Sequence, residues 1–184
     1  HVLLRHDVTA KEFNLGLVIS QYQKKNDLTF SLSIYCTEAF SFGKSPDLLK
    51  HKMRIKGAWT DKTAGGAMGR SRRFYCNPQY EIEVKKECQL EIMMKATPTI
   101  SINATVVPSN GRRRVETLGS KEDQVLSTGD YRAGVAYCST KSLRPGTYIL
   151  AASAWDAGVT GPFVLDIRSN EEIGKAVIVR ETLD

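Results

Sequence analysis

Apolar and polar residues alternate with a period of two along most of this chain, which is the pattern of half-buried β-strands. Tyr80, Ile82 and Val84 alternate with charged residues, and the same pattern returns over 90–94 and 100–106. Further strands are predicted over 131–138, 147–154, 162–168 and 175–180. No segment carries a long apolar stripe at helical spacing. Short strands separated by turns therefore predict an all-β fold, an antiparallel β-sandwich.

An internal repeat predicts how the chain divides into domains. Residues 15–38 align without gaps onto residues 148–171, with six identical pairs that include Ser20 with Ser153 and Phe30 with Phe163. Each copy is predicted to form a hairpin of strand, turn and strand. We therefore expect a partial preceding sandwich, or an extra hairpin, at the N-terminus. The predicted parts are a C-terminal hairpin of a preceding domain over 1–42, a basic linker over 43–56 and an intact sandwich over 57–184.

Length and composition fit this picture. The 184 residues are 41% hydrophobic and 25% charged, which are globular values and exclude a disordered or fibrous chain. No apolar run approaches the ~20 residues of a membrane-spanning helix. Because the chain starts at His1 rather than at a start methionine, we expect it to begin within a longer polypeptide.

The positive charge is concentrated in one stretch. The whole chain has a net charge of +6, whereas residues 50–75 hold eight basic residues against the single acid Asp61, which gives +7. Such a stretch could bind an anionic membrane, nucleic acid or an acidic protein surface, or it could be a solvated loop. The candidate anion- or partner-binding residues are Lys50, Lys52, Arg54, Lys56, Arg70, Arg72 and Arg73, together with the later run Arg112, Arg113 and Arg114.

Each of these candidates has a plainer alternative. Arg112 to Arg114 follow an Asn-Gly turn, where a solvated hairpin tip is expected. Nucleic-acid binding would require stacking aromatic residues among the basic ones. Only Phe74 and Tyr75 lie beside the arginines, so no nucleic-acid partner is predicted.

Cysteine and histidine residues do not predict a catalytic or metal site. Cys36, Cys76, Cys88 and Cys138 include no C-x-x-C pair, and the three histidines do not cluster with them in the sequence. Cys36 and Cys88 fall in predicted strands, where a free cysteine behaves as a small apolar residue. A Cys–His nucleophilic pair formed by distant residues stays open at this point. No catalytic residue, metal ligand or cofactor is predicted.

A secreted, immunoglobulin-like domain is an alternative interpretation. Asn103-Ala104-Thr105 is a glycosylation sequon, and Cys76 and Cys138 are spaced loosely like an immunoglobulin disulfide. The expected tyrosine two residues before the second cysteine is absent, because position 136 is alanine. A reduced, cytoplasmic chain is the favoured prediction.

The sequence does not support either of two common ligand sites, a P-loop or a calcium loop. Gly43-Lys44-Ser45 lacks the first glycine of a P-loop, since position 38 is glutamate. Calcium sites need several carboxylates, and the candidate loops offer only Asp27 and Asp156. Neither a P-loop nucleotide site nor a strong calcium site formed by one loop is expected.

Several motifs, taken in order, resemble the C2-like β-sandwich called domain III of the calpain cysteine proteases. The resemblance covers about residues 13–171 and is closest to the calpain-7/PalB branch, which has two such sandwiches in tandem. The strings that carry it are Lys56–Trp59, Thr63–Gly66, Asn77–Tyr80, Ser127–Arg132, Arg144–Tyr148 and Gly161–Phe163. The family-motif residues with expected structural roles are Trp59, Gly65, Gly66, Asn77, Pro78, Gly129, Tyr131, Gly146, Ser153, Trp155 and Phe163.

The resemblance implies a non-catalytic regulatory and scaffolding domain of an intracellular papain-like protease. The implied partners are the chain's own protease domain, the tandem C2-like domain and, through the parent chain, ESCRT-III-associated proteins. Cytoplasmic localisation with endosomal recruitment follows as an expectation. The alternative function is a phospholipid-binding C2-type domain that docks on anionic endosomal membranes through residues 50–75. In conventional calpains the matching sandwich carries an acidic loop, whereas residues 50–75 here are basic.

Overall fold

A computed structural model describes residues 29–43, 48–112, 114–116, 123–174 and 176–179. The chain divides into two compact units, His1–Pro46 and Asp47–Asp184, of which the second contains every assigned strand. In the first unit, residues 29–43 are exposed and carry no strand assignment. The predicted first hairpin lies mostly outside the described residues. No described helix is long and apolar enough to cross a membrane.

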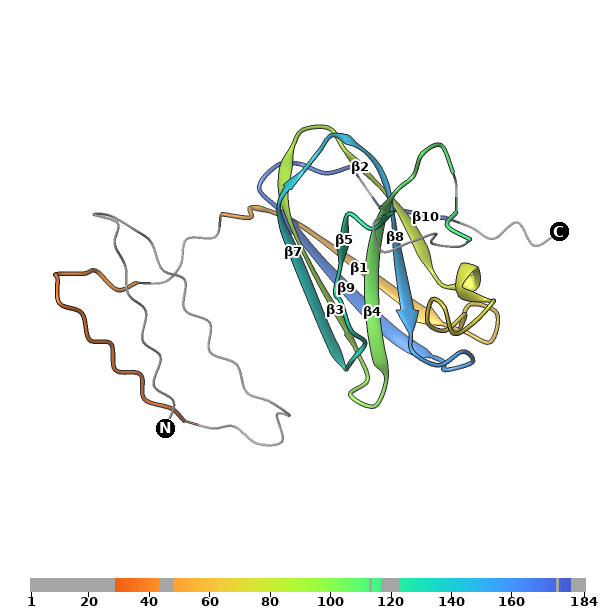
Figure 1. The fold of residues 1–184 in the computed structure, drawn as a ribbon, viewed down its shortest axis with the longest axis horizontal. Coiled ribbons are helices and arrows are strands. Elements are labelled where there is room, and N and C mark those ends of the chain that lie inside the picture. The colour runs from red at the N-terminus through yellow and green to blue at the C-terminus, as the bar shows by residue number, and fades with distance from the viewer. Residues whose placement is uncertain (1–28, 44–47, 113, 117–122, 175, 180–184) are drawn as a thin grey trace. The chain divides into compact units, whose positions relative to one another are not determined.

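The second unit is a sandwich of two antiparallel sheets (Figure 1). Sheet A has the strand order β1-β9-β3-β7, and sheet B has the order β10-β2-β8-β4-β5, with β6 also paired to β4. The strands are β1 (His51–Trp59), β2 (Gln79–Val84), β3 (Cys88–Ala96), β4 (Ser101–Pro108), β5 (Leu126–Ser127), β6 (Arg132–Ala133), β7 (Val135–Leu143), β8 (Gly146–Ala154), β9 (Gly161–Ser169) and β10 (Val177–Ile178). The prediction of an all-β antiparallel sandwich is confirmed.

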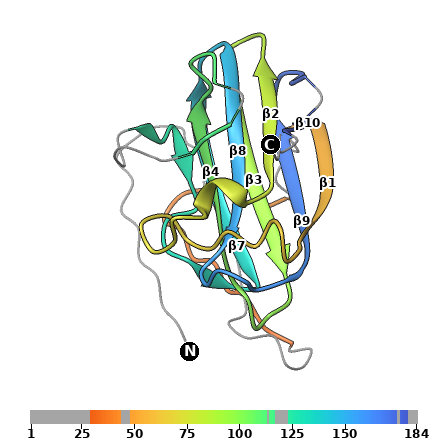
Figure 2. The same cartoon turned by 90° about the vertical axis from the view of Figure 1, so that its right-hand side faces the viewer.

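The predicted linker is wrong at its C-terminal end. Residues 51–56 form the first two-thirds of β1, which pairs with β9 over nine residues from His51 opposite Ser169 to Trp59 opposite Gly161. Met53 and Ile55 are partly buried against the core, whereas Lys52, Arg54 and Lys56 are exposed. The basic residues are therefore the solvent side of an edge strand, which Figure 2 shows beside β9 at one margin of the sandwich.

The predicted hairpin over 148–171 is also wrong. β8 pairs with β2 and β4 in sheet B, whereas β9 pairs with β1 and β3 in sheet A. The connection at 155–160 therefore crosses from one layer to the other instead of turning back along the same sheet. Alternation alone gives each strand a buried face but does not identify the strand with which it pairs.

Both sheets bury their inward side chains in one core. Trp59 is 2% exposed and donates its indole N–H to the Ala152 carbonyl in the opposite sheet, at 3.0 Å. The Trp59 and Phe163 rings lie with their centroids 4.6 Å apart. Gly57 makes room for this packing, because a Cβ atom there would lie 2.3 Å from the Phe163 ring. The other largest buried side chains come from β2, β3, β4, β8 and β9.

Sheet B is covered on its outer side by the chain itself. Val107 and Ile149 point outward from β4 and β8, yet each is at most 2% exposed because Val115 and Val179 pack over them. Gln79 fixes this cover: its side-chain amide donates to the Val115 carbonyl at 2.9 Å and accepts from the Val115 N–H at 2.8 Å. Within the second unit, the described residues provide no comparable cover for the outer side of sheet A.

Candidate functional site

The structure divides the basic stretch 50–75 between two surfaces. Lys52, Arg54 and Lys56 project from β1 on the outer side of sheet A, and exposed Lys50 precedes that strand. Arg70, Arg72 and Arg73 are exposed on the loop over residues 60–77, here called the end loop, which follows β1 at the end of the sandwich. The ten candidate anion-binding residues therefore do not form one surface.

The outer face of sheet A is a grid of three rows across four strands. The rows are Lys56, Val164, Lys95 and Val135; Arg54, Asp166, Met93 and Tyr137; and Lys52, Arg168, Glu91 and Ser139. In these three rows every position on β1 is basic and every position on β7 is uncharged, so charge decreases across them; the exposed Lys141 lies further along β7. We use the name outer face of sheet A for these twelve residues.

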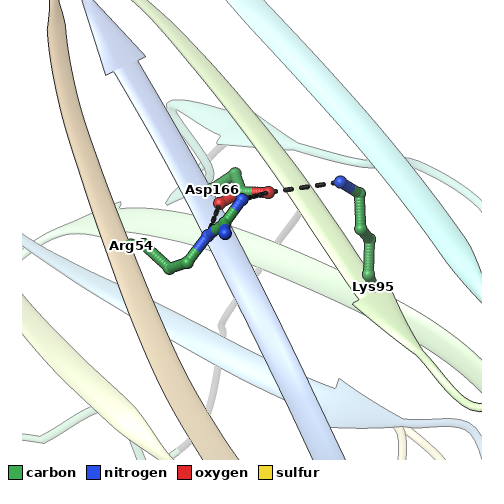
Figure 3. A network of polar contacts seen from close by, with 3 residues as sticks. All are labelled: Arg54, Lys95 and Asp166. Atoms are coloured by element: carbon green, nitrogen blue, oxygen red, sulfur yellow. Dashed lines mark hydrogen bonds and ion pairs between the residues drawn. The ribbon is translucent and has the colours of Figure 1, made fainter.

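Asp166 links three strands of this face (Figure 3). Its carboxylate accepts two hydrogen bonds from the Arg54 guanidinium, at 2.5 and 3.1 Å, and one from the Lys95 ammonium at 3.2 Å. The Asp166 side chain is only 19% exposed, whereas that of Arg54 is 63% exposed. Two cations thus share one carboxylate, and neither is fully neutralised.

The hydrogen bond from Arg54 is the main cause that holds the pKa of the Asp166 carboxyl below its ordinary value. Sequence reasoning named Arg54 but missed Asp166 and Lys95. Asp166 stands 112 positions away from Arg54 in the sequence, and only the strand register brings them together. The alternating charge of 52–56 was a usable signal for an edge strand, but nothing local identified its acidic partner.

Arg114 does not extend from a solvated hairpin tip. Its guanidinium donates to the backbone carbonyls of Tyr75, Asn77 and Val179, at 2.5, 2.8 and 3.1 Å respectively. This residue fastens the cover of sheet B and cannot serve as a free anion-binding group. Arg112 is exposed and donates to the Ser109 carbonyl, whereas Arg113 lies outside the described residues.

Asn77 organises the end loop from within. It is fully buried; its amide oxygen accepts from the Gly65 N–H at 3.1 Å, and its amide nitrogen donates to the Gly66 and Phe74 carbonyls at 2.8 and 2.9 Å. The short 3-10 turn Phe74–Cys76 delivers Asn77 to this position. Three buried backbone groups depend on this one side chain, which accounts for its place in the motif.

Gly65 and Gly66, two of the family-motif residues, allow neighbouring backbone segments to lie close to them. A Cβ atom on Gly65 would lie 2.2 Å from the Arg73 carbonyl oxygen. Gly66 has a φ of +78°, and a Cβ atom there would lie 2.7 Å from the Ala157 backbone nitrogen. The end loop and the 155–160 connection therefore pack backbone against backbone, which larger residues at these positions would prevent.

Tyr131, Ser153 and Trp155 form an aromatic corner next to the end loop. The Tyr131 hydroxyl bonds the Ser153 hydroxyl at 2.7 Å, and the Tyr131 and Trp155 rings meet edge to face with centroids 5.1 Å apart. The Arg70 guanidinium stacks 4.5 Å above the Trp155 ring and lies 3.9 Å from the Asp156 carboxylate. Trp155 keeps 39% of its surface exposed. Arg70 is thus partly engaged within the molecule.

The remaining motif residues lie at turns or in the sheet. Gly129 has a φ of +74° in the turn before Tyr131, and its carbonyl accepts from the Asn103 amide at 2.6 Å. Gly146 opens β8, and the Pro78 carbonyl accepts from the Ala152 N–H. Asn103 is 5% exposed and its amide nitrogen is already bonded. The predicted sequon therefore has no accessible acceptor in the folded chain.

The cysteine residues are free thiols. Cys76, Cys88 and Cys138 are buried, and Cys36 is exposed in a segment without the strand that the sequence predicted there. Burial raises the pKa of the Cys138 thiol to about 12 and also raises that of Cys88, which keeps both thiols protonated and unreactive. Within the described ranges, no three His, Cys, Asp or Glu side chains gather as a metal site.

Comparison with known sequences gives a consistent result. The family model described as "Calpain large subunit, domain III" matches residues 55–168. Calpain-7 of Sus scrofa is 31% identical over 153 residues, covering 83% of this chain and 18% of the relative. The calpain-like protease palB/RIM13 of Aspergillus oryzae is 28% identical over 170 residues, covering 92% of this chain and 20% of the relative. The chain thus spans about a fifth of the length of these relatives.

Among solved structures, the pre-peptidase C-terminal domain of collagenase from Bacillus anthracis matches with a TM-score of 0.41 and 13% identity. That match covers 63% of this chain and 88% of the collagenase domain.

Proposed function

Because this chain belongs to the calpain large-subunit domain III family, we propose that it is a non-catalytic regulatory and scaffolding module of a calpain-7-like cysteine protease. The region it matches is domain III, not the catalytic core, and the family has the C2-like β-sandwich fold. The observation that carries the proposal is the match over residues 55–168, which runs from the second half of β1 to the end of β9.

The chemistry of the described residues supports this role. Catalysis by a cysteine protease requires an accessible thiolate beside a base. All three cysteines of the sandwich, Cys76, Cys88 and Cys138, are buried, whereas the exposed Cys36 belongs to the first unit. The polar residues that match family motifs, Asn77 above all, bond to backbone groups that hold loops in place. These are the properties of a rigid support for other domains.

The proposal extends to partners. They are the protease domain of the parent chain, the preceding tandem C2-like domain, which would include residues 1–42, and ESCRT-III-associated proteins reached through the parent chain. Cytoplasmic localisation with recruitment to endosomes is part of the proposal.

Deletion of residues 47–184 from the parent protease tests the scaffolding role. We expect the deleted protein to have a lower melting temperature for its protease domain, lower peptidase activity, or both, because a docked module stabilises the domain that it contacts. A parent carrying Lys85→Glu, an exposed change in the turn between β2 and β3, serves as the control. Unchanged activity and unchanged melting of the deleted protein would contradict the proposal.

A second candidate function is docking on anionic membranes through the end loop. Lys62, Arg70, Arg72 and Arg73 are exposed there, and half-exposed Trp155 lies beside them. Each basic residue near an anionic surface contributes about 1 kcal/mol, so four give at most about 4 kcal/mol, which is millimolar binding. Arg70 is also partly engaged by Trp155 and Asp156. This weak expected affinity makes membrane docking the second choice.

Sedimentation with phosphatidylserine vesicles at increasing salt tests this candidate. Binding that falls with salt, and that is lost in Arg72→Glu/Arg73→Glu, would favour the membrane function. Arg112→Glu is the matched control, because it reverses an exposed arginine outside the end loop. Absence of binding at low salt would remove the candidate.

A further inference from the structure

The outer face of sheet A is an exposed sheet surface in a molecule that covers its other sheet. Val115 and Val179 pack over the outer side of sheet B, whereas Tyr137 and Val135 on sheet A are 48% and 51% exposed. Met93 and Val164 between them are only partly buried. Tyr, Met and Arg are enriched in protein–protein interfaces, and this face has Tyr137, Met93, Arg54 and Arg168, beside Lys, Glu and Asp residues that interfaces contain less often.

Charge on this face is unequally distributed and incompletely paired. It holds five basic residues, Lys52, Arg54, Lys56, Lys95 and Arg168, against the two acids Asp166 and Glu91. Asp166 is shared by Arg54 and Lys95. Among the described residues, none forms an ion pair with Lys56 or Arg168, which are both exposed. A complementary surface must therefore bring acids of its own.

We propose that the outer face of sheet A docks a protein segment that carries acidic residues over β1 and an apolar residue over β7. The inference deepens the proposed scaffolding function and rests on it, because it names the surface and the chemistry of the partner. The spacing follows from the sheet: β1 and β7 are separated by three inter-strand steps, about 14 Å at about 4.8 Å each. An extended segment that crosses the strands spans this distance with about four residues.

A protein segment fits this face better than a membrane. Asp166 and Glu91 lie within the face, and two of its cations already bond to Asp166. The large exposed apolar residues among its twelve members, Val135 and Tyr137, lie on β7. An anionic membrane would bring negative charge over Asp166 and Glu91 as well as over the cations, whereas a polypeptide can place its acids over the cations alone.

A peptide of defined pattern tests the proposal with the 184-residue chain. The probe is a synthetic peptide with Glu-Asp-Glu, four Gly/Ser residues and Leu-Phe; the control peptide replaces Leu-Phe by Ser-Ser. In a titration followed by 1H–15N NMR, we expect amide shifts on β1, β9, β3 and β7. The control peptide should bind about fivefold more weakly, because it lacks the apolar contact with Tyr137 and Val135.

Variants identify the residues responsible. Lys56→Glu/Arg168→Glu should weaken binding of the probe about tenfold or more, through like-charge repulsion, and the milder Lys56→Gln serves if the double variant does not fold. Tyr137→Ser should weaken binding about fivefold. Lys85→Glu, an exposed lysine outside the face, should leave binding unchanged.

Several outcomes would overturn the proposal. They are no shifts, shifts confined to the end loop, equal binding of both peptides, or variants that bind like the unmodified chain. Binding to phosphatidylserine vesicles that is lost in Lys56→Glu/Arg168→Glu, without binding of the peptide, would assign the face to a membrane instead. If the chain binds the peptide but deletion of residues 47–184 leaves the activity and melting of the parent protease unchanged, this inference stands and the scaffolding function is rejected.

Discussion

At the residue scale, Asp166 shows how one carboxylate joins strands that are distant in the sequence. It lies directly opposite Arg54 on β1 and diagonally opposite Lys95 on β3, so each neighbouring strand contributes a cation. Edge strands that carry cations resist pairing with other chains. Asp166 reduces the repulsion between these cations while β1 keeps its basic outer side.

We expect Asp166→Asn to make the melting temperature of the chain depend less on pH at acidic pH. The pKa of the Asp166 carboxyl is lowered in the folded chain, so its contribution is fully present above its unfolded pKa of about 3.9 and is lost as pH falls through the folded value. Thermal melting between pH 2 and 7 measures this. The variant should melt slightly earlier than the unmodified chain at pH 6 and approach it as the pH falls below the unfolded pKa of about 3.9.

Asp130→Asn is the control for this experiment, because Asp130 is exposed in the turn before Tyr131. If Asp166→Asn and Asp130→Asn change the pH profile equally, the ion network on sheet A does not contribute to stability.

At the element scale, the end loop is held by backbone contacts that only glycine permits. Gly66 and Gly69 have similar φ angles, +78° and +76°, yet only Gly66 faces another backbone, that of Ala157. Alanine substitutions at these two glycines therefore allow the free-energy cost of the left-handed conformation to be separated from the cost of a steric clash.

Gly69→Ala should lower the free energy of unfolding by about 1 kcal/mol, the cost of a left-handed residue with a side chain. Gly66→Ala should lower it by about 2–4 kcal/mol, because the end loop must also move away from Ala157. Urea denaturation of both variants measures the difference. Equal effects would show that the close approach at Gly66 does not constrain the loop.

The elements that sequence reasoning predicted correctly are those with a buried, alternating face. β2, β3 and β9 follow the period of two closely, whereas β4 and β8 are buried on both faces over most of their length. β1 was missed because its exposed positions are Lys52, Arg54 and Lys56, so its charge masked the weaker alternation of Met53 and Ile55. The roles of Asn77 and Arg114 depend on backbone groups up to 65 positions away. No local pattern could reveal such partners.

At the scale of the whole molecule, the sandwich is complete without the first unit. The unit boundary lies between Pro46 and Asp47, and every strand of both sheets lies after it. Among the residues that the structure describes, the buried core likewise begins after this boundary, at Leu49. The fold class was predictable because it depends on the number and spacing of strands, whereas the assignment of strands to layers depends on long-range pairing.

A chain of residues 47–184 should unfold in a single cooperative transition, because one core unites both sheets. We expect its melting temperature to lie within about 3 °C of the sandwich transition in the full chain. Circular dichroism and calorimetry measure both. Removal of residues 47–59 in addition would delete β1 and should abolish the transition. A large fall in melting temperature for 47–184 itself would mean that the first unit stabilises the sandwich.

The register of β1 with β9 has a mechanical consequence. His51 lies opposite Ser169, so the polypeptide enters the first strand and leaves the ninth at the same end of sheet A. Once the two-residue β10 has released, tension along the parent chain would peel β1 from β9 row by row, as a zipper opens, instead of shearing all rows together. The Arg54–Asp166 pair lies in the fourth row from that end. When force is applied at its two ends, this sandwich would therefore unfold at a lower force than a sandwich whose terminal strands must be sheared apart.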